Sequence, residues 1–377
     1  MGFSENPRPL PQVIMKYMIG LKKIDIYIIK KFLGTYIFSI LLIISVSVVF
    51  DFNEKVDYFI KNSAPVKAII FDYFLNFIPY YANLFSSLFT FISVIYFTSK
   101  LADNSEVIAM LSSGISFSRL MRPYMISAFI IALITLLLSS FVIPPANVTR
   151  IEFQNKYVRN KKVDYASNIQ FEIEPGLVAF FESYNADTKK GTRFSLDRFE
   201  GKELVSRLIA KSIVYDSAYH WIINHYMIRN FTGMKEEIQE GAKIDTTLRV
   251  IPSDFLISID DCEQMSTPEL RKFANRQKQR GMGDIQSFEI EYHKRFAMSF
   301  AAFIMTIIGA SLSSRKIKGG MGFNIGMGLL LSFSYILFMQ ITSSFAISGT
   351  VSPFVAVWIP NILYSFIAAY LYVKAPR

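Results

Sequence analysis

Six apolar runs, each long enough to cross a lipid bilayer, restrict this chain to a membrane fold. A helix needs about 20 apolar residues to span the hydrocarbon core, and helices satisfy their own backbone hydrogen bonds there. The first run is too long for the apolar part of a signal peptide, so we interpret it as a retained span. The sequence predicts six transmembrane helices, at 26–50, 68–98, 123–143, 296–314, 321–347 and 353–373.

Residues 144–286 differ from the runs on either side of them. Polar and charged residues are dense, and apolar stretches alternate with turn residues in the manner of β-strands, at 177–181, 193–196, 208–215 and 221–228. We expect an all-β sandwich or jelly roll here. A polar helix should follow, capped by Ser266 or Thr267 with Pro268 in its first turn. The expected architecture is therefore a membrane α-helical fold of three plus three spans with an inserted, jellyroll-like all-β domain.

Basic residues near the span ends predict the orientation of the chain. One side of the membrane carries most of them: Lys22, Lys23, Lys30, Lys31, Lys100, Arg119, Arg122, Arg315, Lys316, Lys318, Lys374 and Arg377. With an even number of spans, both termini lie in the cytoplasm and the β insert lies outside, which in a bacterium is the periplasm. The net charge of +10 then reflects membrane orientation, and we expect no nucleic-acid partner.

These boundaries divide the chain into four parts. They are a cytoplasmic or interfacial segment at 1–25, three spans at 26–143, the insert with its linking helix at 144–286, and three spans at 287–377.

The charged stretch between the second and third runs predicts a short cytoplasmic helix at 103–114. Asp103 and Glu106 have the spacing of a capping box, and Gly114 is placed to end the helix. The apolar residues between them share one helical face. Such a helix is either an ordinary turn between spans or a plug for a socket on a partner.

No catalytic motif is present in the sequence. The glycine-rich run at 319–328 has no preceding strand and no following Lys-Ser/Thr, so it is not a nucleotide-binding loop. Gly322 and Gly326 instead have the spacing of a close helix contact. The histidines are dispersed, at His220, His225 and His293, and the single cysteine allows no internal disulfide. We expect no catalytic site, no metal and no cofactor in this chain.

Charged residues at membrane depth are functional candidates by default. Glu291 and Arg295 lie four residues apart, in the order that favours an ion pair on a helix. The other candidates flank the apolar runs or lie inside them: Asp51, Glu54, Lys55 and Asp72. The alternative is that these charges lie in the headgroup layer, particularly at 51–57. The later spans lack carboxylates, which disfavours an ion-coupled transporter.

Five short motifs occur in one order along the chain. They are Asp25–Phe32 at the start of the first span, Ser105–Val107 leading to Gly114–Ser116, Pro144–Asn147 after the third span, Glu291-x-x-x-Arg295 before the fourth, and Trp358–Asn361 in the last. With these motifs in this order, the chain resembles the LptF/LptG (YjgP/YjgQ) family of lipopolysaccharide-export permeases over nearly its whole length. We take it as an LptG-like subunit, although the residues do not separate the two roles.

The resemblance implies a non-catalytic transmembrane subunit of an ATP-driven exporter in the bacterial inner membrane. Its partners would be a cytoplasmic LptB-like ATPase dimer that binds ATP, a second LptF/LptG-type permease, and LptC-like and LptA-like proteins of a periplasmic bridge. Lipopolysaccharide would pass from the membrane to that bridge. The coupling helix would comprise Ser105, Glu106, Val107, Met110 and Gly114, with Glu106 meeting the ATPase. Candidates for the lipid cavity are Lys30, Lys31, Asp51, Glu54, Lys55, Glu291 and Arg295.

The sequence departs from the family pattern in two places. Acidic Asp51 and Glu54 stand where relatives carry basic residues, and Ser299 stands where a proline is usual, which predicts a straighter fourth span. An alternative function of another class is a membrane-anchored scaffold whose insert binds periplasmic proteins without moving lipid.

Overall fold

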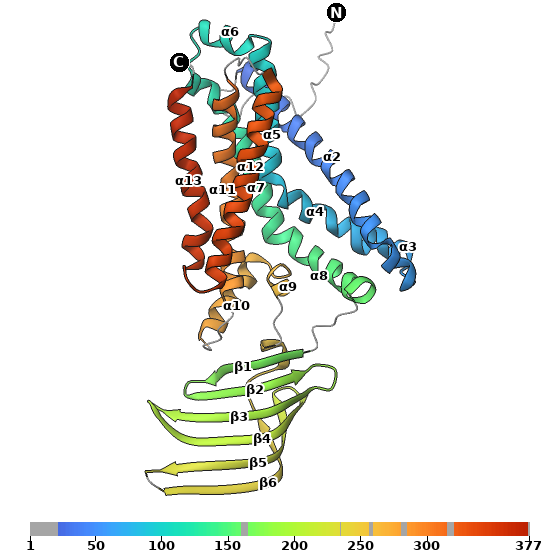
Figure 1. Ribbon diagram of the computed structural model, residues 1–377, viewed down its shortest axis with the longest axis vertical. Helices are drawn as coiled ribbons and strands as arrows, with labels where there is room; N and C mark the ends of the chain where they lie inside the picture. Colours follow the sequence, from blue (N-terminus) through green and yellow to red (C-terminus); the bar gives the residue numbers. More distant parts are fainter. Residues whose placement is uncertain are drawn as a thin grey trace, which may run out of the picture. The chain divides into compact units, whose positions relative to one another are not determined.

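The computed structural model describes six segments of the 377-residue chain: 22–159, 165–233, 235–255, 259–279, 285–314 and 320–375. They divide into two units (Figure 1). Unit 1 contains Met1–Asp51, Ile78–Leu138 and His293–Arg377, and unit 2 contains Phe52–Phe77 and Ser139–Tyr292. The predicted segment before residue 22 lies outside the described residues, as do Arg315, Lys316, Lys318 and Arg377.

The first three spans are built from helices with several breaks. In chain order these are α2 (Lys23–Lys61), α3 (Val66–Ala68), η1 (Ile69–Phe74), α4 (Leu75–Leu84), α5 (Ser86–Asp103), α6 (Glu106–Ser112), α7 (Phe117–Leu137), η2 (Leu138–Val142), α8 (Ile143–Gln154) and η3 (Asn155–Arg159). The later helices are η4 (Pro252–Asp254), α9 (Ile259–Cys262), α10 (Thr267–Gln279), α11 (Gln286–Ser313), α12 (Gly320–Ile347) and α13 (Pro353–Lys374).

The expected membrane-helical fold with an inserted β domain is confirmed. Within the described segments, five helices are long and apolar enough to cross a membrane, and a bent pair at 66–103 makes a sixth candidate. Three of the candidates precede the strands and three follow them.

The second span bends where the sequence did not indicate it. Pro79 lies inside the continuous helix α4 and does not divide the span. The 60° bend instead separates α4 from α5 at Phe85, whose backbone leaves the helical region. Phe85 therefore divides this span into two helices.

The two prolines after the third apolar run do not end the helix. The π-helical turn η2 leads directly into α8, and Pro144 and Pro145 occupy the first turn of α8. Proline is accommodated there because the first N–H groups of a helix have no partner within the helix. The helical segment consequently continues to Val158 instead of stopping at Ile143.

The core of unit 1 gathers the ends of several helices. Ile28 of α2, Leu101 of α5, Val107 of α6 and Phe117 of α7 belong to one buried cluster, together with Ala375 after α13. The Phe117 ring also contacts the Tyr372 ring, with 5.7 Å between centroids. The start of α2, the short helix α6, the start of α7 and the end of α13 therefore lie together.

Hydrogen bonds between buried side chains tie the helices of unit 1 to one another. The Tyr36 and Ser86 hydroxyls are 2.7 Å apart, and Ser86 is 3.0 Å from the Thr135 hydroxyl, which joins α2, α5 and α7. The Asn324 side-chain amide of α12 donates to Ser99 Oγ of α5 at 3.0 Å.

Asn361 makes a second junction in unit 1. Its side-chain oxygen accepts from the Tyr335 hydroxyl at 2.9 Å, and its side-chain N–H donates to the Ala297 carbonyl at 2.9 Å. Asn361 is only 1% exposed, and it joins α11, α12 and α13.

Among the described residues, Gly322 and Gly326 do not make the close helix contact that their spacing predicts. A Cβ atom added at either glycine would meet nothing within 4 Å. The close approach occurs at Gly328, where an added Cβ would overlap the Ile95 side chain of α5.

The strands of unit 2 form one antiparallel sheet in chain order, β1-β2-β3-β4-β5-β6. They are β1 (Tyr165–Glu174), β2 (Leu177–Asn185), β3 (Lys190–Glu200), β4 (Glu203–Ser217), β5 (His220–Thr232) and β6 (Lys235–Thr247). The four predicted strands fall within β2 to β5. The expected two-sheet topology differs from the single meander that is observed, and β6 was missed because its mostly exposed residues lack an apolar alternation.

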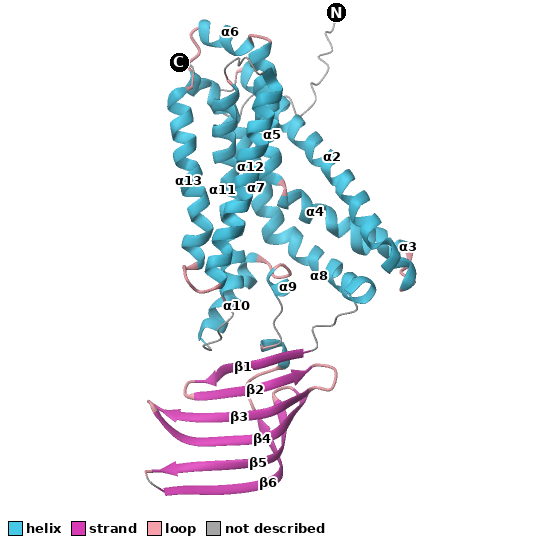
Figure 2. Ribbon diagram, viewed as in Figure 1, coloured by secondary structure: helices cyan, strands magenta, loops and turns pink. Residues whose placement is uncertain are grey.

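The sheet changes its inward-facing register along one line that crosses every strand. In each of the five pairs of neighbouring strands, one residue pair on this line is missing from the regular pairing. On this line β1, β3 and β5 have residues with left-handed backbone, namely Asn168, Arg193 and His225, with φ of 53°, 44° and 51°. In β4 the residues of the apolar core on either side, Ala210 and Ile213, are three residues apart. Because this spacing breaks the period of two, the single sheet curls around one core (Figure 2).

Aromatic side chains fill that core. Phe181, Phe194 and Trp221 are fully buried, and Phe255 from the segment after β6 packs on Phe181 with 5.0 Å between ring centroids. The Trp221 indole N–H donates to the Val250 carbonyl at 2.9 Å, which fixes the covering segment 248–255 to β5.

Helix α10 begins as expected. Ser266 precedes it, and the Ser266 N–H and hydroxyl both donate to Glu269 Oε2, at 3.0 and 2.6 Å. These hydrogen bonds from Ser266 lower the pKa of the Glu269 carboxyl, because they favour its charged form.

Candidate functional site

Helix α6 is a seven-residue helix held at both ends by short connections to α5 and α7. Two backbone hydrogen bonds end it: the Gly114 N–H donates to the Leu111 carbonyl at 3.0 Å, and the Ile115 N–H donates to the Met110 carbonyl at 3.2 Å. Gly114 has φ of +87°, the left-handed conformation that such a helix end requires. The predicted role of Gly114 in ending the helix is therefore confirmed.

The predicted capping box at the start of α6 is wrong. Asp103 is the last residue of α5, and the residue before α6 is Ser105, which has φ of 60° and makes no side-chain capping bond. Glu106 accepts a 3.1 Å hydrogen bond from the Asn104 side-chain amide instead. The capping pattern failed because α5 continues through Asp103, so the helix spans 106–112 and not 103–114.

The residues of α6 divide into an inner and an outer face. Val107 is 1% exposed and belongs to the core of unit 1, with Met110 and Leu111 packed against the same cluster. Ile108 is 54% exposed, and Ser105 and Ala109 are also exposed. Val107 and Met110 therefore anchor the helix, and the sequence analysis missed Ile108 as the apolar residue of its outer face.

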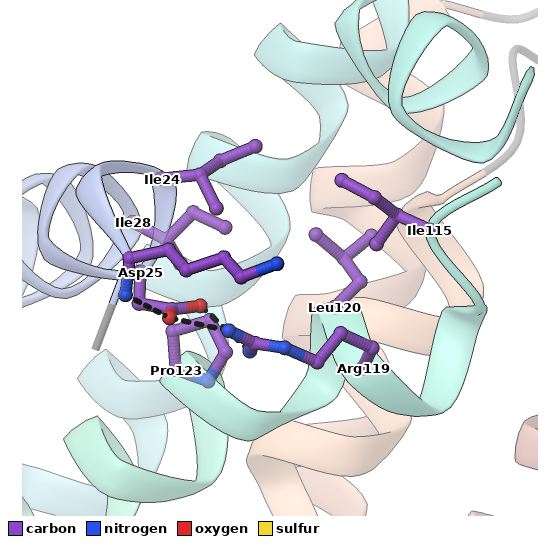
Figure 3. A pocket seen from close by; sticks show the side chains of 8 residues that line it. Ile24, Asp25, Ile28, Ile115, Arg119, Leu120 and Pro123 are labelled. Carbon is purple, nitrogen blue, oxygen red and sulfur yellow. Dashed lines mark hydrogen bonds and ion pairs between the residues drawn. The ribbon is translucent and has the colours of Figure 1, made fainter. Parts of the chain in front are cut away.

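An ion pair beside α6 joins two segments 94 residues apart in the sequence (Figure 3). The Arg119 guanidinium donates through Nη1 to Asp25 Oδ1 at 2.8 Å and through Nη2 to Asp25 Oδ2 at 2.6 Å. The Asp25 side chain is 2% exposed, and Asp25 Oδ2 also accepts the Lys22 backbone N–H at 2.8 Å. The pair borders a small cavity of about 40 Å³ whose apolar lining includes Ile28, Ile115 and Leu120.

Sequence reasoning did not find this ion pair. It placed Asp25 in a motif at the start of the first span and Arg119 among the orienting basic residues, with no partner for either. The signal available was an acidic residue in the first turn of an otherwise apolar span, which needs a partner when it is buried.

The candidate lipid-contacting residues of α2 lie in different environments. Lys30 and Lys31 are exposed, as is Glu54, whereas Asp51 is 9% exposed. The Lys55 ammonium donates to the Tyr73 hydroxyl at 2.6 Å, and Tyr73 also accepts from the Gln154 amide at 3.3 Å. Lys55 is thus held against the aromatic residues of unit 2.

Glu291 and Arg295 lie one turn apart near the start of α11. Glu291 is half-buried and Arg295 is 4% exposed. Their ion pair stays a prediction. Ser299, in place of the usual proline, donates its hydroxyl to the Arg295 carbonyl at 2.9 Å, and α11 is continuous through this position.

Metal-binding and redox chemistry find little support among the described side chains. No group of three or more His, Cys, Asp or Glu residues in these segments is arranged to hold a metal ion. Cys262 is 3% exposed, and burial raises the pKa of its thiol to about 12. The thiolate form that reacts and binds metals is therefore disfavoured.

Comparison with known families gives a match over nearly the whole chain. Residues 26–374 match the family described as "Lipopolysaccharide export system permease LptF/LptG". No curated protein matches the chain.

Proposed function

The chain belongs to the LptF/LptG family of lipopolysaccharide export permeases, transport proteins rather than enzymes, and from this premise we propose that it is the non-catalytic membrane subunit of an ATP-driven exporter. In this proposal a separate cytoplasmic ATPase hydrolyses ATP, and a second permease of the same family completes the membrane part. Lipopolysaccharide leaves the inner membrane through the pair and passes to bridge proteins in the periplasm.

The outer face of α6 is the observation that carries the proposal. An exposed isoleucine, Ile108, lies beside the charged Glu106 on a short helix anchored by buried Val107. An exposed apolar residue flanked by a carboxylate suits a protein socket better than either water or lipid. Because the connections at both ends of α6 are short, a displacement of this helix would be passed on to α5 and α7.

The proposed orientation places α6 and both termini in the cytoplasm and the sheet in the periplasm. The packing of unit 1 supports it, because the start of α2, the end of α5, helix α6, the start of α7 and the end of α13 lie together. On or directly beside these segments lie Lys22, Lys23, Lys100, Arg119, Arg122 and Lys374. This concentration of basic residues follows the positive-inside rule.

Helix α2 is the proposed lipid-contacting span. Its middle section exposes a band of large apolar side chains, namely Ile37, Phe38, Leu41, Leu42, Val46, Val49 and Phe50. Exposed Lys30 and Lys31 supply positive charges on the same helix, which suit anionic headgroups. Buried Asp51 and exposed Glu54 do not suit phosphate binding, so we assign the phosphate contacts of the outer half to Lys55 or to the second permease.

The charge of Glu106 tests the proposal directly. We expect Glu106→Arg to reach the membrane in normal amounts and to lower lipopolysaccharide release at least tenfold, because a guanidinium replaces the carboxylate that faces the ATPase. Asp103→Arg is the matched control, since it reverses an exposed acidic residue three positions away at the end of α5. Normal transport by the Glu106→Arg protein in cells would show that the coupling assignment is wrong.

Photo-crosslinking from positions on the sheet distinguishes an exporter subunit from the alternative, a scaffold that does not move lipid. A crosslinker at Ile213 would be enclosed, because this residue is fully buried in the core of the sheet. Phe180, which is half-buried, and Ile209, which is 46% exposed, are better crosslinker sites. A crosslinker at either position should capture lipopolysaccharide if the insert carries lipid. Capture of protein alone would favour a scaffold.

A further inference from the structure

The Asp25–Arg119 ion pair connects the segment that follows α6 to the first turn of α2. From Gly114 to Arg119 the chain is fixed at each step: the Ile115 N–H bonds to Met110 of α6, and Ser116 caps α7 by accepting the Arg119 N–H at 3.3 Å. Arg119 thus lies at the end of a short, hydrogen-bonded path that begins on α6.

The pair is built to transmit displacement. Two parallel N–H···O bonds fix the guanidinium in both position and orientation relative to the carboxylate. The Asp25 carboxylate is fixed in turn by the Lys22 backbone N–H and by burial beside Ile28 and Leu120 (Figure 3). Asp25 has no solvated alternative at low cost, because its side chain is 2% exposed and a buried charge without its partner is strongly destabilising, whereas the Arg119 side chain is 25% exposed.

Few other polar contacts join this part of α2 to its neighbours. Between residues 23 and 50, the side-chain hydrogen bonds that leave α2 for another described helix are those of Asp25 and the Tyr36–Ser86 pair. The hydroxyls of Thr35 and Ser45 bond back to carbonyls of α2 itself. Beyond Tyr36 the helix exposes its apolar band on one side, while Ile40 and Ile43 pack against the core of unit 1. The side-chain hydrogen bonds that join this part of α2 to other described helices therefore lie near its start.

We propose that Asp25 and Arg119 form the mechanical link that passes movement of α6 to the lipid-exposed helix α2. The proposal rests on the proposed function, since it assumes that α6 is displaced by the ATPase. Asp25 and Arg119 act as positioning residues, and neither contacts lipid or nucleotide. Loss of the link should leave ATP hydrolysis intact while separating it from lipid movement.

The test uses the complete exporter, with this chain, the second permease and the ATPase, in proteoliposomes that contain lipopolysaccharide. Arg119→Lys keeps the charge but loses the two-bond geometry, and Asp25→Asn keeps the shape but loses the charge. Arg122→Lys is the matched control, because Arg122 is exposed one turn further along α7. The measured quantities are ATP hydrolysed, lipopolysaccharide released per ATP, and subunits retained on co-purification.

We expect Arg119→Lys and Asp25→Asn to hydrolyse ATP within about twofold of the wild type and to release about tenfold less lipopolysaccharide per ATP. Arg122→Lys should match the wild type in both. An unchanged yield per ATP in both variants would overturn the proposal. A parallel fall of hydrolysis and release, with loss of subunits, would also overturn it, because the pair would then only support assembly.

A second measurement does not depend on lipid release. A fluorescent probe on a cysteine in place of exposed Leu41 reports the environment of α2 when ATP is added, and buried Cys262 should contribute little labelling. We expect ATP to change the fluorescence in the wild type and in Arg122→Lys. In Arg119→Lys, we expect this ATP-dependent change to be at least threefold smaller. If the signal depends on Arg119 but the wild type releases no lipopolysaccharide, the proposed function fails and the link stands. If the signal is equal in all three proteins, the link fails.

Discussion

The helices of unit 1 and the sheet of unit 2 both bury apolar side chains, but the helices also bury many small polar ones. Helix α5 buries small polar residues along its length, including Ser86, Thr90, Ser93, Thr98 and Ser99. The sheet buries Phe171, Phe181, Phe194, Trp221 and Phe255. The difference shows which medium each region is built for.

Lipid tails are as apolar as leucine, so burying an apolar side chain between membrane helices gains little. Close approach and hydrogen bonds must hold such helices together, and the junctions at Ser86 and Asn361 do this. In water the removal of apolar area is itself the main driving force, at roughly 25 cal/mol per Å². An aromatic core is therefore sufficient for the sheet.

The largest effect should come from truncating the core of the sheet. Trp221→Ala removes the largest buried side chain and its bond to Val250, and we expect it to lower the free energy of unfolding of the insert by about 3–5 kcal/mol. Limited proteolysis of the full chain in membranes measures the loss. Trp358→Ala, in α13, is the control and should leave the sheet protected. Unchanged protection in Trp221→Ala would contradict the role given to the aromatic core.

A smaller effect is expected where polar junctions hold the helices. Asn361→Ala removes two hydrogen bonds that join α11, α12 and α13, and it should lower helical stability by about 1–2 kcal/mol. Unfolding in mixed micelles with increasing denaturing detergent measures this difference. Tyr335→Phe removes only one of the two bonds and should cost less. A larger loss from Tyr335→Phe than from Asn361→Ala would contradict the role of Asn361 as the junction, because Tyr335→Phe keeps the ring and removes only the hydroxyl.

The smallest effect should come from an exposed ion pair of the sheet. Arg193 and Glu182 are 3.0 Å apart with side chains 79% and 40% exposed, so solvent screens the attraction. Arg193→Ala should change the stability of the insert by no more than about 0.5 kcal/mol. A loss that approaches that of Trp221→Ala, in the same proteolysis measurement, would contradict the description of this ion pair as weak and screened by solvent.

The sequence predicted the parts of the fold that depend on local pattern. Apolar length located the spans, alternation located four strands, and a Ser or Thr cap followed by Pro268 located the start of α10. Local pattern failed where geometry is set elsewhere: Pro144 and Pro145 are compatible with a helix start as well as a stop, and nothing in Phe85 signals a bend. The register change at Arg193 and His225 depends on all six strands together.

The candidate site was predicted in part for the same reason. The presence of a short helix here and its end at Gly114 follow from local signals, whereas its start at Glu106 does not. Local signals do not show which residues of α6 face outward. Val107 is buried by helices distant in sequence, whereas its neighbour Ile108 is exposed. The pairing of Asp25 with Arg119 spans 94 residues, and no periodicity in one sequence reports it.

The central claim is that α6 receives work from a cytoplasmic ATPase, and a photo-crosslinking amino acid at Ile108 tests it most directly. In intact cells we expect irradiation to join this position to an ATP-binding protein, whereas the same amino acid at Phe366, an exposed residue of α13, should yield no such product. A product from Ile108 that contains only lipid or a periplasmic protein would contradict the account.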